Sequence, residues 1–143
     1  MKRVMTSALL AIVVLASHAA GADKALTDLN GAWEVTSLEQ SGVKLPAEQV
    51  QAMLMVLTMK DGKFTTKMGS NEIDKGTYKA GDIANSVDIA SNAPELKGKT
   101  IKALYKLDGQ TLTVAYDLSG GDRPTEFTTK AGTQLLVETY RKK

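Results

Sequence analysis

Apolar and polar residues alternate with a period of two along most of the chain beyond residue 30. The clearest run is Thr100–Leu107, in which isoleucine, alanine, tyrosine and leucine face one way and two lysines face the other. Alternation of this kind is typical of a β-strand with one buried face. The pattern predicts eight short strands, at residues 33–38, 53–60, 63–68, 72–79, 86–91, 100–107, 111–116 and 135–141.

Turn signals separate these strands, and the connections between them have room for only one short helix. Asp61-Gly62 and Asp108-Gly109 are strong hairpin signals, because both central residues of a tight turn need positive φ. Residues 46–52 begin with a proline at the first helical position, which predicts a short helix after the first strand.

Consecutive hairpins form an antiparallel meander, and a meander of this length closes on itself to remove its edges. The sequence therefore predicts an all-β fold, a small antiparallel up-and-down β-barrel of about eight strands with one short helix. A two-sheet sandwich with a similar number of strands is the alternative.

The first 22 residues have the layout of a cleaved secretory signal peptide. Two basic residues precede an apolar stretch at residues 9–16, and Ala20-Gly21-Ala22 fits the small-residue pattern of a cleavage site. The apolar stretch is far shorter than the roughly 20 residues that cross a bilayer, so we expect no membrane span. We predict export to the periplasm or the extracellular space, with residues 23–143 as one β-barrel domain.

Charge in the mature chain is balanced. Removing residues 1–22 takes away Lys2 and Arg3 and no acidic residue, which leaves 16 basic and 16 acidic residues. A neutral surface of mixed sign offers no electrostatic footprint for nucleic acid or anionic lipid. We therefore expect no nucleic-acid partner, and we predict a monomer.

Histidine and cysteine are both missing from the mature chain. The single histidine, His18, lies in the signal peptide, and the chain contains no cysteine. Thiol chemistry, nucleophiles activated by histidine, and zinc, copper or haem held by histidine or cysteine are therefore excluded. We predict no metal and no cofactor.

Carboxylates remain as the candidates for acid–base chemistry. Asp122 and Glu126 flank Arg123 in one loop, and Glu72 and Asp74 lie two residues apart near a turn. These acids fall at turns or outward positions, whereas a glycosidase, for example, needs one acid with a pKa raised by burial. We predict no catalytic residues, an interior without buried charge, and an ion pair of Arg123 that holds the last crossover connection. The chain is not expected to be an enzyme, and the sign of one would be two or more carboxylates that converge in a cleft.

Gly31-x-Trp33 at the first strand resembles the start of the lipocalin barrel. In that family the tryptophan closes the base of the barrel, and an arginine near the end of the last strand packs across its ring. Arg141 stands at the matching place, and a guanidinium over an indole is a cation–π contact worth about 0.5–2 kcal/mol. The resemblance implies that Gly31, Trp33 and Arg141 form the structural closure of the barrel.

A longer resemblance covers nearly the whole mature chain. The uncharacterised lipocalin-like domain family common in planctomycete bacteria is similar in spacing and sequence to LNGAWEVTSLEQSGVKLP, GTYK, GKTIKALYKLDGQTLTVAY and DRPTEF. The last of these, Asp122–Phe127, is the most specific because it stands before the final strand. The resemblance implies a lipocalin-like barrel in exported or envelope-linked proteins. It implies no activity, since the family has no established one.

Alternation also predicts which side chains point into the barrel. They are Trp33, Val35, Leu54, Val56, Phe64, Met68, Val87, Ile89, Ile101, Tyr105, Leu112, Val114, Tyr116 and Leu135. An eight-stranded barrel is just wide enough either to fill with side chains or to hold one small ligand. The predicted ligand-binding lining consists of Val56, Phe64, Met68, Ile89, Tyr105 and Tyr116.

These observations favour an exported, non-enzymatic, lipocalin-like binding module for a small apolar or amphipathic ligand. The alternative is a protein-interaction module of the cell envelope, in which side chains fill the barrel and the loops at residues 40–52 and 117–128 contact another envelope protein. A cavity inside the barrel distinguishes the two hypotheses, because only the first requires one.

Overall fold

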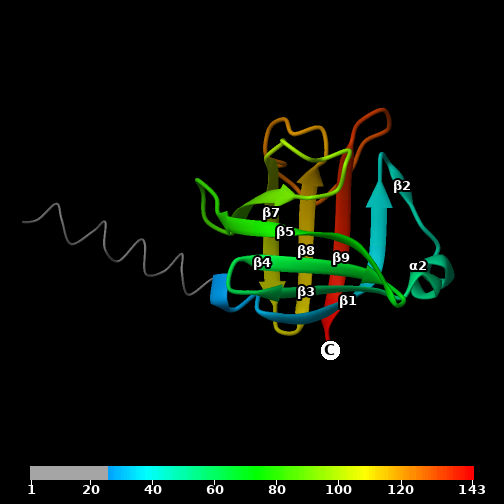
Figure 1. Cartoon of the computed structure of the whole chain (residues 1–143). Coiled ribbons are helices and arrows are strands. Elements are labelled where there is room, and N and C mark those ends of the chain that lie inside the picture. Colours follow the sequence, from blue (N-terminus) through cyan, green and yellow to red (C-terminus); the bar gives the residue numbers. More distant parts are fainter. Residues whose placement is uncertain (1–25) are drawn as a thin grey trace, which may run out of the picture.

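Nine β-strands and the short helix α2 follow one another along residues 26–143, the part of the chain that this computed structural model describes (Figure 1). In chain order they are β1 (Gly31–Gln40), β2 (Val43–Lys44), α2 (Ala47–Met53), β3 (Met55–Lys60), β4 (Lys63–Met68), β5 (Asn71–Ala80), β6 (Ser86–Ser91), β7 (Ile101–Asp108), β8 (Thr111–Asp117) and β9 (Leu135–Lys142). The predicted signal peptide, residues 1–22, lies outside the described residues.

The strands form a closed antiparallel barrel. From β3 to β9 each strand pairs with the next, and β1 pairs with both β3 and β9, so that β1 and β3–β9 complete a ring of eight strands. The two-residue strand β2 pairs with the end of β1 beside this ring. In Figure 1, β3, β4 and β5 run across β7, β8 and β9. The predicted up-and-down barrel is confirmed, and the sandwich alternative is wrong.

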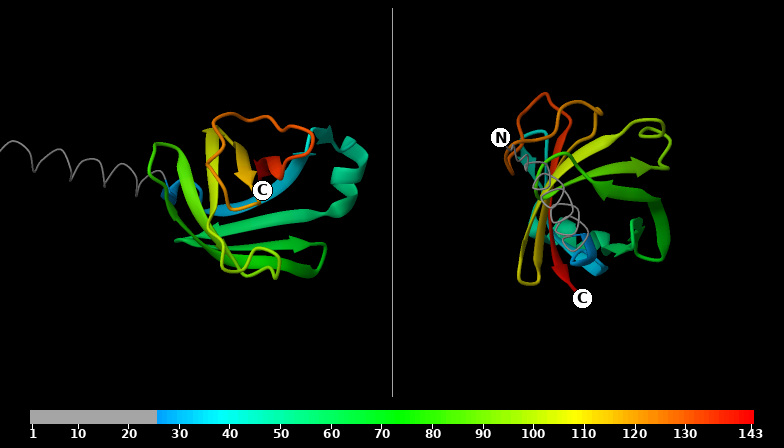
Figure 2. Two further views of the ribbon diagram at one scale, coloured as in Figure 1. Left: turned by 90° about the horizontal axis from the view of Figure 1, so that it is seen from above. Right: turned by 90° about the vertical axis from the view of Figure 1, so that its left-hand side faces the viewer.

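The short helix also agrees with the prediction, since α2 covers Ala47–Met53 and follows Pro46. Figure 1 and the left-hand view of Figure 2 place α2 and the segment that leads into β1 at opposite ends of the barrel. Leu54 ends the helix in a left-handed conformation, with φ 50° and ψ 44°, and its N–H donates to the Gln51 carbonyl. Leu54 therefore belongs to the helix cap, and its side chain is exposed.

The side chains of β3 face the opposite way from the prediction. Met55, Leu57 and Met59 are buried, whereas Leu54 and Val56 were expected to point inward. Four of the six residues of β3 are apolar, and its two polar residues, Thr58 and Lys60, share the outer face with Val56. Pairing fixes the same facing, because Leu57 lies directly opposite the buried Trp33 and cross-strand partners share a face.

Strand β9 differs from the prediction in the same way. Leu136, Glu138 and Tyr140 line the interior, whereas Leu135 was expected to point inward and does not line it. The pairs Leu112 with Tyr140 and Val114 with Glu138 fix this facing, since β8 presents its apolar face to the interior. A one-residue change of register moves every side chain of a strand to the other face.

Trp33 is fully buried at the start of β1. Its Nε1 donates a hydrogen bond of 2.8 Å to the Leu29 carbonyl, so the one polar atom of the indole is satisfied. Gly31, two residues earlier, has a φ of +135°, and a Cβ there would lie 3.0 Å from the Lys142 side chain. Glycine suits position 31, because the chain there has a positive φ and packs against Lys142 at the end of β9.

The cation over Trp33 is Lys142, and the prediction of Arg141 is wrong. Lys142 Nζ lies 5.5 Å from the centroid of the indole ring, whereas Arg141 makes an exposed ion pair with Glu34 at 3.6 Å. The register explains the exchange, because β1 and β9 pair Trp33 with Lys142 and Glu34 with Arg141. Neighbouring residues of a strand face opposite sides, so Arg141 points outward.

Arg123 holds the loop between β8 and β9 to the barrel. Its guanidinium contacts Asp82 at 2.9 Å and Asp88 at 2.7 Å, and it donates bonds of 3.0 Å to the backbone carbonyls of Val87 and Ala103. The hydrogen bond from Arg123 lowers the pKa of the Asp82 carboxyl. The predicted ion pair of Arg123 is present, with partners from the β5–β6 turn and from β6 rather than from its own loop.

We expect Arg123→Ala to lower the free energy of unfolding by about 2 kcal/mol, because it removes a buried cation and leaves partly buried acceptors without a donor. Urea unfolding followed by Trp33 fluorescence measures the effect. Arg141→Ala is the matched control, since it removes an exposed ion pair worth at most about 1 kcal/mol. Equal effects of the two substitutions would contradict the anchoring role of Arg123.

Candidate ligand cavity

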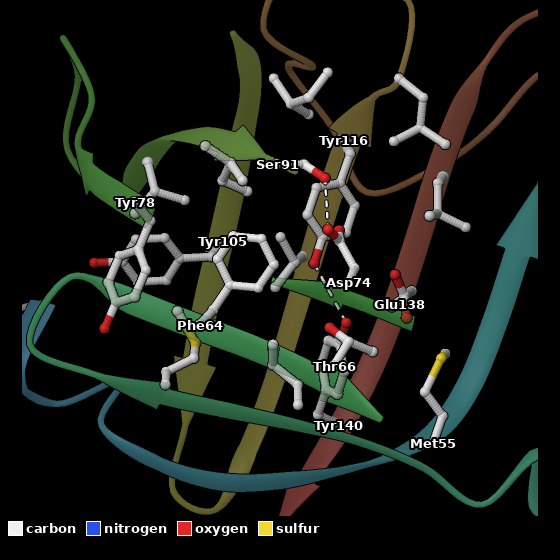
Figure 3. Close-up of a pocket in the computed structure, with 18 of the residues that line it drawn as sticks. Met55, Phe64, Thr66, Asp74, Tyr78, Ser91, Tyr105, Tyr116, Glu138 and Tyr140 are labelled. Atoms are coloured by element: carbon white, nitrogen blue, oxygen red, sulfur yellow. Dashed lines mark hydrogen bonds between the residues drawn. The ribbon is translucent and has the colours of Figure 1, made fainter. Parts of the chain in front are cut away.

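The barrel encloses a cavity of about 310 Å³ (Figure 3). Side chains from every strand of the eight-stranded ring line it, together with residues from the connections and from α2. They are Leu29, Leu38, Gln40, Met53, Met55, Leu57, Met59, Phe64, Thr66, Ile73, Asp74, Tyr78, Val87, Ile89, Ser91, Leu96, Ile101, Tyr105, Leu112, Val114, Tyr116, Leu118, Leu136, Glu138 and Tyr140.

Size and composition of the cavity suit a small molecule. Pockets for small ligands have volumes of about 300–1,000 Å³ and are mostly apolar with a few placed polar groups. This cavity lies at the lower end of that range. Three methionines, Met53, Met55 and Met59, contribute to the lining. Their flexible thioethers can adapt to ligands of different shape.

Four of the six residues predicted to line a ligand site do line the cavity: Phe64, Ile89, Tyr105 and Tyr116. Met68 packs against the core cluster and is not part of the cavity wall. Val56 does not face the interior at all. It lines a separate depression with Glu34 and Leu54, because the facing of β3 is reversed relative to the prediction.

The polar residues of the cavity gather toward one end. Figure 3 shows Asp74, Tyr116, Tyr140 and Glu138 toward the end of the cavity where Met55 lies, and Tyr78 at the other end. They come from three strands: Asp74 from β5, Tyr116 from β8, and Tyr140 and Glu138 from β9. We call these four residues the polar end of the cavity.

Hydrogen bonds fix two parts of the polar end. Asp74 Oδ1 accepts a bond of 2.7 Å from Ser91 Oγ and another of 2.7 Å from the backbone N–H of Lys75. The hydroxyls of Tyr116 and Tyr140 lie 3.3 Å apart and share one hydrogen bond. One hydroxyl proton is not used in this bond, and the hydrogen bond between Tyr140 and Glu138 can engage it.

Glu138 is a buried acid whose side chain faces the cavity. The residue is 8% exposed, and burial raises the pKa of its carboxyl to about 7, partly offset by a hydrogen bond with Tyr140. Burial disfavours the charged form of an acid, and a nearby cation normally restores it. Within residues 26–143, no lysine, arginine or histidine lines the cavity.

The two tyrosines of the polar end stay protonated. Burial is the largest cause that raises the pKa of Tyr116 and of Tyr140, and the charge of Glu138 raises both further. Their phenols therefore act as hydrogen-bond donors and acceptors and carry no charge at ordinary pH.

The prediction of an interior without buried charge is wrong, because Asp74 and Glu138 both line the cavity. Of the predicted carboxylate pair in β5, Asp74 faces inward, whereas Glu72 is exposed and lies 3.6 Å from Lys75. Asp122 and Glu126, the other pair, are exposed in the loop before β9. The acids that share a site are thus 64 positions apart in the sequence, Asp74 and Glu138.

Sequence reasoning missed Glu138 because a charged residue in an alternating strand normally marks the solvent face. One signal could have found it. Leu136, Glu138 and Tyr140 alternate in step with Leu112, Val114 and Tyr116, and this becomes visible once β8 and β9 are paired in the observed register.

Comparisons with protein-family models, with curated proteins and with solved structures found no match to this chain. The resemblance to the lipocalin-like domain family therefore stays a prediction. Within residues 26–143, no helix is long and apolar enough to cross a membrane. The same residues contain no group of three or more acidic, histidine or cysteine side chains arranged to hold a metal ion.

Proposed function

We propose that the protein is an exported, non-enzymatic binding module that holds one small amphipathic ligand inside its barrel. The observation that carries this proposal is the cavity of about 310 Å³, apolar over most of its wall and polar at one end. An apolar wall takes up a hydrocarbon body by the hydrophobic effect, and a few fixed polar groups orient its head. The signal-peptide pattern of residues 1–22 supports export.

The cavity favours ligand binding over the alternative of an interaction module with a filled barrel. That alternative needs side chains to occupy the interior, and the lining side chains leave enough space for a small molecule. The lipocalin-like resemblance of the Gly31-x-Trp33 segment is consistent with the same proposal, because an eight-stranded barrel of this kind can hold one small ligand.

Binding also accounts for the polar groups better than catalysis does. Ser91 Oγ donates to Asp74 and accepts a bond of 3.0 Å from the backbone N–H of Ala93, so this hydroxyl is engaged in fixing the end of β6. A nucleophilic serine needs a neighbouring general base to take its proton, most often a histidine, and the mature chain has none. Asp74 and Glu138 are two carboxylates in one cavity, but Asp74 Oδ1 already accepts bonds from Ser91 Oγ and the Lys75 N–H, which supports a fixed acceptor for a ligand over a general base.

A neutral probe tests the proposal without assuming a particular head group. We expect the purified protein to bind Nile red with enhanced fluorescence, and octanol to displace it. Thr66→Trp should weaken binding of both compounds by about tenfold or more, because the indole would occupy space in the cavity that Thr66 lines.

Thr65→Trp is the matched control for this experiment. Thr65 is the neighbour of Thr66 on β4 and does not line the cavity, so the same added bulk falls outside the proposed site. Binding that is lost in both variants, or a native protein that binds neither Nile red nor octanol, would overturn the proposal.

A further inference from the structure

Resting on the proposed function, we propose that the ligand is a cation, an alkyl ammonium whose chain fills the apolar part of the cavity and whose head lies between Asp74 and Glu138. Two acidic residues from opposite parts of the sequence reach the same small cavity. No ion pair among the described residues includes either of them. A positively charged head group would supply the missing counter-charge.

Burial makes this charge arrangement costly without a cation. Glu138 is more than nine-tenths buried and faces the cavity, and its hydrogen bond with the neutral Tyr140 supplies no counter-charge, so burial still disfavours its charged form. The barrel does not provide a basic side chain at this place, although lysines are abundant on its outside. An ammonium group that enters with the ligand pairs with the carboxylate and recovers that cost.

The polar end also matches an ammonium in its hydrogen-bonding groups. A primary ammonium has three donors and no acceptor. Around it, the carboxylates of Asp74 and Glu138 are acceptors, and a tyrosine hydroxyl offers a further lone pair. A fatty acid of the same length would instead place a third carboxylate beside two others, and like charges in a poorly solvated site repel strongly.

Size sets the other limit on the ligand. The cavity of about 310 Å³ lies at the lower end of the range for small-ligand pockets and has room for one short alkyl chain. Its apolar wall, which includes Leu57, Phe64 and Tyr105, takes the chain, and the polar end takes the head. The inferred ligand class is therefore a small primary amine with an apolar body.

Isothermal titration calorimetry with three probes of one chain length tests the inference: octylamine, octanol and octanoate. At about pH 8 we expect octylamine to bind at least about tenfold more tightly than octanol, as charge-assisted hydrogen bonds allow, and octanoate to bind most weakly. Glu138→Gln and Asp74→Asn should each remove most of the advantage of octylamine. Both substitutions should lower the affinity for octanol less than that for octylamine, because a neutral hydroxyl makes no charge-assisted hydrogen bond. Glu34→Gln, which alters an exposed carboxylate of the outer surface, is the control and should leave all three affinities unchanged.

Acidification provides a second readout. Octylamine stays protonated at about pH 5.5, since alkyl ammonium groups have a pKa near 10, whereas Glu138 gains a proton below about pH 7. The titratable groups around Glu138 are Tyr116 on β8, Tyr140 on β9 and Asp74 on β5, and β1 contributes the uncharged Leu38 and Gln40. We therefore expect the affinity for octylamine to fall on acidification while that for octanol stays constant.

The possible outcomes separate the two proposals. Octanol binding without any preference for octylamine would overturn the cationic ligand and leave the proposed function intact. If octanoate bound most tightly, the cationic ligand would likewise be overturned and the proposed function would stand. Failure of all three probes to bind would overturn the proposed function itself, together with the inference that rests on it.

Discussion

Glu138→Gln is expected to make the barrel more stable at about pH 8, by about 2–3 kcal/mol. The native carboxyl has a pKa raised to about 7 by burial, against an ordinary value of 4.5 in the unfolded chain. Between these values the folded protein keeps a proton that the unfolded chain has lost, so stability falls as pH rises. Each unit of pKa shift corresponds to about 1.4 kcal/mol, and glutamine has no charge to bury.

The stability difference between Glu138→Gln and the native protein should depend on pH. Below about pH 4.5 the carboxyl is protonated in both states, so the variant and the native protein should be about equally stable. The difference should grow from there to about pH 7 and then stay constant. Urea unfolding at a series of pH values measures it. A difference for Glu138→Gln that is the same at all pH values would contradict the burial of this carboxyl.

Trp33→Ala is expected to lower the free energy of unfolding by about 3–5 kcal/mol, the range for removal of a large buried aromatic side chain. Trp33 is fully buried, lies opposite Leu57 and Lys142, and its hydrogen bond to Leu29 holds the segment that leads into β1. Circular dichroism must follow unfolding, since Trp33 is the single tryptophan of the chain.

Two further variants separate the contributions at this site. Trp33→Phe keeps most of the apolar volume and loses the hydrogen bond to Leu29, so it should cost less than Trp33→Ala. Ile83→Ala removes an apolar side chain that is 55% exposed and should change stability by at most about 0.5 kcal/mol. If Trp33→Ala cost no more than Ile83→Ala, the placement of Trp33 in the core would be wrong.

Most of the fold could be predicted from local sequence. Alternation locates the strands, Asp61-Gly62 and Asp108-Gly109 locate two hairpins, and Pro46 locates the helix. These signals depend only on neighbours in the chain, which is why they succeed. Alternation also chose the right face for β8, where Leu112 and Val114 alternate with less apolar residues.

The candidate site was harder to predict because it depends on pairing between distant strands. In β3 the pairing of Leu57 with Trp33 fixes the inner face. In β9 the pairing of Glu138 with Val114 places an acid where local pattern expects solvent. The partners of Arg123, Asp82 and Asp88, lie 35 or more residues away along the chain. No period within a single strand contains this information.

The pairing of β1 with β9 has a consequence for the way the barrel folds. The Thr36 hydroxyl and the Thr139 carbonyl, which meet along this seam, are separated by 103 residues of chain. The other strands of the ring mostly meet a near neighbour in sequence, so their hairpins can form early, whereas closing so large a loop carries a high entropic cost. The seam should therefore form late, and until it does both β1 and β9 present an unpaired edge. During folding, this is the interval in which association with another unfolded copy competes with closure of the barrel.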